Sequence, residues 1–292
     1  MEGRMNRGKQ RFLVTPQNVL NRLRTAVPAA FALIAAFAVQ AEEPGREAFV
    51  AGDYAKALEI WQPMAEEGDA RAQFNVGLIY DEGLGVDRDR EKAREWWSLA
   101  AEQGLLTAGY NLALLEIEQS TADTGGGDIE QALADLRKTA EAGHLPARYT
   151  LGKIYQYGVG VAEDPAAAVE HIRAAAEGGL AKAQYSLGKA YRDGSGVEQD
   201  AAQAAKWFGQ AALRGHAGAQ DHYARRLANG EGLEKDPVRA MTFAVLAMRA
   251  GVEDAAALAE EIRKELTIEE LDAAFRAADG FEARAESPAG EE

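Results

Sequence analysis

A segment of about 36 residues recurs along this 292-residue chain. The copies read EGDARAQFNVGLIYDEGLGVDRD at 67–89, AGHLPARYTLGKIYQYGVGVAED at 142–164, GGLAKAQYSLGKAYRDGSGVEQD at 178–200 and, more loosely, RGHAGAQDHYARRLANGEGLEKD at 214–236. One glycine marks each repeat, with successive spacings of 36, 39, 36, 36 and 36 residues: Gly68, Gly104, Gly143, Gly179, Gly215 and Gly251. A fixed period of this length indicates stacked repeats, because a unit this small cannot bury its apolar face alone.

Each repeat is predicted to be a pair of helices. An aspartate is expected to cap the start of the first helix, where its carboxylate accepts hydrogen bonds from free backbone N–H groups: Asp89, Asp128, Asp164, Asp200 and Asp236. The marker glycine ends that helix in the left-handed conformation that glycine tolerates. A further glycine inside the second helix lets a neighbouring helix approach closely. The structural markers of the repeat are therefore Gly68, Gly77, Gly143, Gly152, Gly179, Gly188 and Gly215.

These residues resemble the Sel1-like repeat, a relative of the tetratricopeptide repeat. Residues 72–89 and 183–200 match its A-Q-[YF]-x-[LV]-G-x-x-Y-x-x-G-x-G-V-x-x-D pattern, and 147–164 does so except for Arg148 at the glutamine position. The second repeat departs, since Ala113 replaces the glycine and a longer loop is expected at 117–128. The resemblance implies an all-α, right-handed solenoid of αα-hairpins over 47–265, with about five full repeats and a partial sixth.

The two ends of the chain differ from the repeats. A basic start, an apolar run at 26–39 and the small residues of VQA indicate a signal peptide at 1–41, cleaved after Ala41. Fourteen apolar residues are few for a membrane span, although an uncleaved anchor is the alternative, and Met5 is a second possible start. We expect a short linker at 42–46. Thr267 and Glu270 predict a capping box that opens a C-terminal capping helix at 266–281, before a disordered acidic tail at 282–292.

Composition narrows the function. The chain has no cysteine, which excludes disulfides, thiolate metal sites and cysteine nucleophiles. Its formal net charge of −15 argues against nucleic acid as the main partner. Without residues 1–41, which carry six basic residues and one acid, the charge becomes −20.

No motif for catalysis, a cofactor or a metal is evident. The glycine pairs of GLGV, GVGV and GSGV follow helices, whereas a phosphate-binding loop opens one, so they are interpreted as turns. His144 and His216 each follow a marker glycine and are expected in surface loops, while His171 and His222 lie in helices without metal-ligand spacing. We therefore expect no enzyme activity, no cofactor and no metal.

The strongest functional signal is a column of first-helix residues eight positions before each marker glycine. It contains Ile60, Trp96, Asp135, His171, Trp207 and Phe243. This variation from aspartate to tryptophan is not what stacking alone demands, and in related solenoids the first helices line the concave groove. The residues seven positions before the glycine, such as Trp61 and Phe208, are instead expected in the core. The alternative is that both columns are core, since bulky aromatic residues mostly are.

The sequence thus predicts a non-enzymatic scaffold or regulator in the bacterial cell envelope. It would be periplasmic or secreted, without a stable membrane span after cleavage, and would bind another protein through its concave surface by the column just described. The alternatives are a secreted Sel1-like hydrolase with penicillin-binding activity, or the same scaffold held by an N-terminal anchor. The cysteine-rich relatives that suggest the hydrolase carry cysteine pairs that this chain lacks. The residues do not indicate an oligomeric state.

Overall fold

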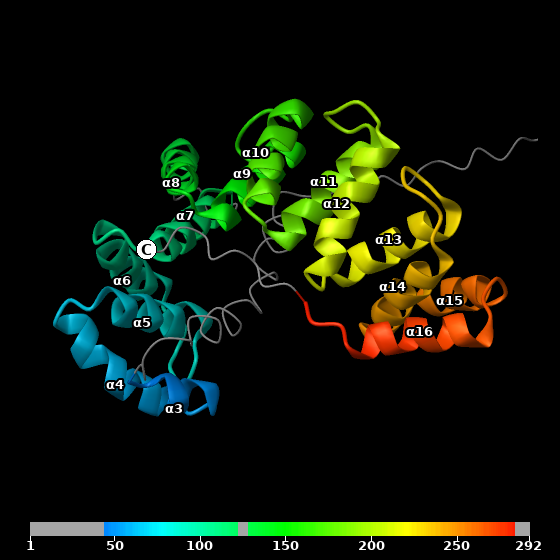
Figure 1. The fold of residues 1–292 in the computed structure, drawn as a ribbon. Coiled ribbons are helices and arrows are strands. Elements are labelled where there is room, and N and C mark those ends of the chain that lie inside the picture. Colours follow the sequence, from blue (N-terminus) through cyan, green and yellow to red (C-terminus); the bar gives the residue numbers. More distant parts are fainter. Residues whose placement is uncertain (1–43, 122–127, 284–292) are drawn as a thin grey trace, which may run out of the picture. The chain divides into compact units, whose positions relative to one another are not determined.

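A computed structural model describes residues 44–121 and 128–283, and every regular element in these ranges is a helix (Figure 1). The helices are α3 (Arg46–Val50), α4 (Tyr54–Glu66), α5 (Ala70–Glu82), α6 (Arg90–Glu102), α7 (Leu106–Thr121), α8 (Ile129–Glu141), α9 (Leu145–Tyr157), α10 (Pro165–Glu177), α11 (Ala181–Asp193), α12 (Ala201–Leu213), α13 (Ala217–Asn229), α14 (Pro237–Arg249), α15 (Ala255–Arg263) and α16 (Ile268–Asp279). The predicted signal peptide, its cleavage site and the tail beyond residue 283 lie outside the described residues.

The chain divides into two compact units. The first runs up to Leu136 and includes Tyr157–Gly160, and the second contains Arg137–Gln156 and the chain from Val161 onward. The helices follow one another in the predicted pairs, and an even-numbered helix from α4 to α14 is the first of its repeat. None of the helices in the described ranges is both long and apolar enough to cross a membrane.

The predicted capping residues start the first helices. The carboxylate of Asp200 accepts backbone hydrogen bonds from Ala202 and Gln203 at 2.8 and 3.0 Å. Asp128 and Asp164 likewise accept two backbone hydrogen bonds each, and Asp89 and Asp236 accept one each. The marker glycines after these helices all have positive φ, between 79° and 104°. Local chemistry therefore sets both ends of the first helix, as the sequence predicted.

The glycines inside the second helices make room for the following first helix. A Cβ added at Gly77 would lie 2.6 Å from the Trp97 ring, and one at Gly188 would lie 2.9 Å from the ring of Phe208. At Gly152 the added atom would meet Ile172 at 2.5 Å. These three partners occupy the column seven positions before the marker glycine, which is buried in every repeat: Trp61, Trp97, Leu136, Ile172, Phe208 and Ala244. The core prediction for this column is confirmed.

Two sequence expectations are corrected. Residues 117–121, expected in a loop, form the last turn of α7, because this repeat lacks the glycines that end the other second helices. His144 and His216 lie between helices, as expected, and each caps a second helix: Nδ1 of His144 accepts from the backbone of Ala147, and Nδ1 of His216 accepts from that of Ala219. The surface position expected for His144 is wrong. His144 is buried, and burial lowers its pKa to about 4.

The C-terminal helix begins as its sequence predicts. Thr267 Oγ1 accepts from the backbone of Glu270, and the Glu270 carboxylate accepts from the backbone of Thr267. This reciprocal pair is the capping box. Helix α16 packs against α14, where the Thr242 hydroxyl hydrogen bonds to the carbonyl of Ala274.

Candidate protein-binding surface

The first-helix column has two kinds of member in the structure. Ile60, Trp96 and Asp135 of the first unit and His171 of the second are half-buried, so each keeps part of its side chain accessible. Trp207 and Phe243 are only 6% and 5% exposed. We expected these two residues to be accessible to a partner, but neighbouring side chains bury them.

Neighbouring aromatic residues explain the cover over Phe243. Its ring meets Tyr223 of α13 edge-on at 5.0 Å, and Phe281, beyond the end of α16, packs on it at 6.3 Å. The chain that follows the last helix therefore folds back onto the last member of the column. Ala283, the last described residue, also approaches Gly215, where an added Cβ would lie 3.1 Å from the Cβ of Ala283.

The accessible members hold fixed positions. His171 stacks flat on Tyr155 of α9, with ring centroids 5.4 Å apart and planes inclined by 3°. Its pKa is lowered mainly by burial, with further lowering by Arg148 and Arg137 and an opposing effect of Glu170, so a neutral ring is favoured. The carboxylate of Asp135 accepts from the Gln131 amide at 3.1 Å. Trp96 and Ile60 pack partly against the core of the first unit.

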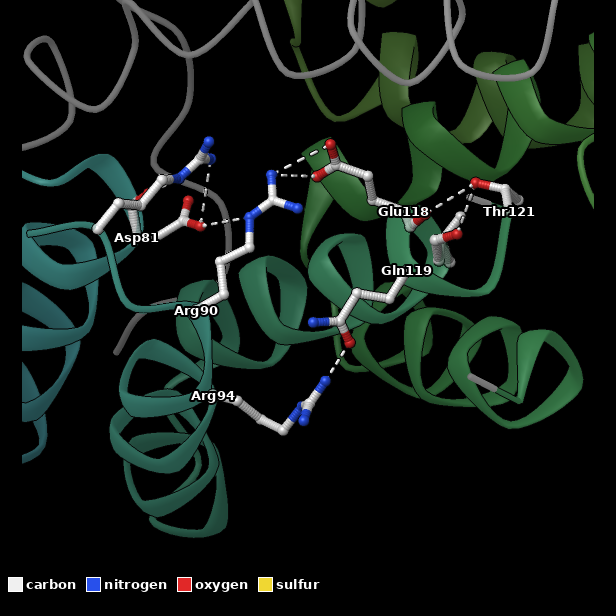
Figure 2. A network of polar contacts seen from close by, with 8 residues as sticks. Asp81, Arg90, Arg94, Glu118, Gln119 and Thr121 are labelled. Atoms are coloured by element: carbon white, nitrogen blue, oxygen red, sulfur yellow. Dashed lines mark hydrogen bonds and ion pairs between the residues drawn. The ribbon is translucent and has the colours of Figure 1, made fainter. Parts of the chain in front are cut away.

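In the first unit, a polar network joins α5, α6 and α7 (Figure 2). Arg90 of α6 donates to the Glu118 carboxylate of α7 at 3.1 and 3.2 Å, and it lies 3.7 Å from the buried carboxylate of Asp81. Arg94, one turn further along α6, hydrogen bonds to Gln119. These contacts hold the last turn of α7 against α6, so the network has a structural role.

The second unit carries a surface that sequence reasoning missed. Lys182 and Lys189 of α11 lie over tyrosine rings, at 5.6 Å from Tyr149 and 5.7 Å from Tyr185, and Lys153 of α9 lies 6.0 Å from the Tyr149 ring. We call these five residues the lysine–tyrosine surface. The pattern was visible in the sequence, because a tyrosine followed four residues later by a lysine recurs 36 residues apart.

Two histidines lie next to this surface, His216 at the N-cap of α13 and His222 within α13. His216 stacks on Tyr185 at 4.4 Å, and His222 lies 4.8 Å from the Phe208 ring. The pKa of His222 is lowered to about 4, first by burial and then by Arg192, which lies 3.3 Å away. Both rings are therefore neutral at pH 7 and act as aromatic surfaces.

Within residues 44–121 and 128–283, no three histidine or carboxylate side chains lie close enough together to bind a metal ion.

The Sel1 repeat family model matches residues 41–69, 70–105, 145–180, 181–216 and 217–252, well over half of the chain. The chain belongs to the Sel1 repeat family. The model passes over 106–144, the repeat that the sequence marked as divergent. The predicted fold class, an all-α solenoid of repeats of about 36 residues, is confirmed, and proteins built from this repeat are generally protein-interaction scaffolds.

Two solved structures are similar to this Sel1 repeat protein. A Sel1 repeat protein from Oxalobacter formigenes is 32% identical with a TM-score of 0.65, over 71% of this chain and 59% of that one. The c5321 protein, a protective antigen of uropathogenic Escherichia coli with the SLR fold, is 31% identical with a TM-score of 0.62, over 78% of this chain and 48% of that one. The match thus spans about half to three fifths of these relatives. Among curated proteins, none matches this chain.

Proposed function

We propose that this Sel1 repeat protein is a non-enzymatic scaffold of the bacterial cell envelope that binds a partner protein through its first-helix column. The observation that carries the proposal is the contrast between two adjacent columns. The residues seven positions before the marker glycine are uniformly buried and apolar, whereas four of the residues one position earlier keep accessible surface and include an isoleucine, a tryptophan, an aspartate and a histidine. Packing does not require that diversity, and binding a particular partner does.

The accessible members have the chemistry of an interface. Trp96 offers a large apolar surface with a polar N–H group, and aromatic anchors of this kind dominate binding energies. His171 is held rigidly by its stack on Tyr155, so little side-chain entropy is lost when a partner contacts it. Asp135 adds a half-buried carboxylate to the column.

The test is in-cell crosslinking and recovery of the tagged full chain. The chain is compared with a Trp96→Ala, His171→Ala double variant and with a Glu95→Ala, Glu170→Ala control, which alters the exposed residues one position earlier on the same helices. We expect one envelope protein to be recovered by the wild type and the control but lost by the double variant at unchanged helicity. Equal recovery by all three would contradict the assignment of the column.

The envelope location has its own test. Export with cleavage after Ala41 predicts a cellular protein whose first residue is Glu42, found in the periplasmic or secreted fraction. An intact mass that still contains residues 1–41 would instead favour the anchored alternative.

A further inference from the structure

The lysine–tyrosine surface is a cationic area on an otherwise acidic chain. Lys182 and Lys189 make cation–π contacts, and in the described part of the chain neither forms an ion pair with a carboxylate. The nearby carboxylates are already held elsewhere, since Asp193 accepts two bonds from Arg192 and Asp221 accepts two from Arg225. Two lysines beside aromatic rings are thus available to an acidic ligand.

The charges of this surface also act on one another. The pKa of Lys153 is lowered to about 8, first by burial and then by repulsion from Lys189 and Lys182. Lysines close enough to shift one another's protonation create a local positive potential. A ligand with several carboxylates would relieve this repulsion.

The end of the described chain approaches this surface. Phe281 packs on Phe243, and Ala283 lies against Gly215, whose neighbour His216 stacks on Tyr185. Lys182 is near enough to His216 to lower its pKa. Residue 283, the last described residue, therefore lies next to the part of the surface formed by α11.

The residues that follow have the complementary charge. Residues 284–292 read RAESPAGEE, with three glutamates and one arginine. Nine residues span up to about 30 Å at ~3.3 Å each, enough to cross from α13 to α9 over neighbouring helices.

We propose that the lysine–tyrosine surface binds an acidic peptide segment, and that residues 284–292 of the same chain are its occupant. The glutamates pair with Lys182 and Lys189, while the backbone of the segment lies along Tyr149 and Tyr185. Any partner that uses this surface must displace the tail. The lysine–tyrosine surface shares no residue with the first-helix column.

Lysine acetylation followed by mass spectrometry tests the proposal on the full chain. It is compared with a chain ending at Ala283 and with a full-length Glu286→Lys, Glu291→Lys, Glu292→Lys variant, in which no residue of the folded surface changes. We expect Lys182 and Lys189 to react at least about threefold faster in both altered chains. The reaction rate follows the fraction of molecules in which the lysines are uncovered, and a threefold rise corresponds to a tail that covers them about two thirds of the time. Lys56, on α4 in the other unit, is the internal control.

A conservative variant tests whether the negative charge of the tail, rather than its presence alone, protects the lysines. Glu286→Asp, Glu291→Asp, Glu292→Asp keeps the charge and should keep the protection, and added salt should remove it. Equal reactivity of Lys182 and Lys189 in the full-length and shortened chains would overturn the proposal. So would a rise in the shortened chain without one in the lysine variant, because the tail would then cover the surface without its carboxylates being recognised.

Discussion

Replacing Gly188 by alanine tests whether close packing, rather than helix propensity, explains the glycine inside each second helix. The new methyl group would lie 2.9–3.1 Å from three atoms of the Phe208 ring. Phe208 is fully buried, so its ring has no open space to move into. Overpacking of this kind costs about 1–3 kcal/mol.

The cost is partly offset by the preference of alanine for helices, which is worth about 1 kcal/mol over glycine. A matched control isolates the packing contribution. At Gly218, in the first turn of α13, the same methyl group would lie 3.4 Å from Tyr185, which is ordinary contact distance. Because both substitutions share a similar propensity gain, we expect Gly188→Ala to be less stable than Gly218→Ala by about 1–3 kcal/mol.

Urea unfolding followed by circular dichroism measures this difference, and hydrogen exchange of α11 and α12 amides shows whether the loss is local, as repeat proteins allow. Adding Phe208→Leu to Gly188→Ala should recover part of the loss, with a coupling of about 0.5 kcal/mol or more, since the smaller side chain leaves room for the methyl group. If Gly188→Ala were as stable as Gly218→Ala, the packing explanation would be refuted.

Two further predictions concern the helix caps. Asp200→Ala should lower the free energy of unfolding by about 1 kcal/mol in thermal or urea unfolding, while Asp200→Asn keeps an acceptor and should lose much less; equal losses would contradict capping. For His144, the folded pKa of about 4 lies below the ordinary value of about 6.5. The unfolded chain thus takes up this proton at a higher pH than the folded chain, so stability should fall as pH drops from about 6.5 to about 4 and be unaffected above that window. His144→Asn can still cap α9 but does not titrate, so its melting temperature should fall less than that of the wild type between pH 7 and 5. An unchanged pH dependence in this variant would show that burial of His144 is not the cause.

The helix pairs were predictable from the sequence because their signals are local. The aspartate caps and the positive-φ glycines act within a few residues of their own position, and the 36-residue period repeats them until chance is excluded. The same locality misled at two places. His144 was expected at the surface, but it is buried where it caps α9. Residues 117–121 were expected in a loop, but α7 continues through them, held by contacts to Arg90 and Arg94 of α6.

The candidate surfaces depended on neighbours that lie far away in sequence. The variable column could be located from its period, but its exposure could not, because Phe243 is covered by Phe281, 38 residues later. The lysine–tyrosine surface likewise exists only where α9 and α11 bring side chains from two repeats together. Sequence by itself determined the repeat, its helices and their ends, since those follow from interactions within one repeat. Tertiary structure decided which side chains remain accessible and which charges meet, since both depend on the stacking of one repeat on the next.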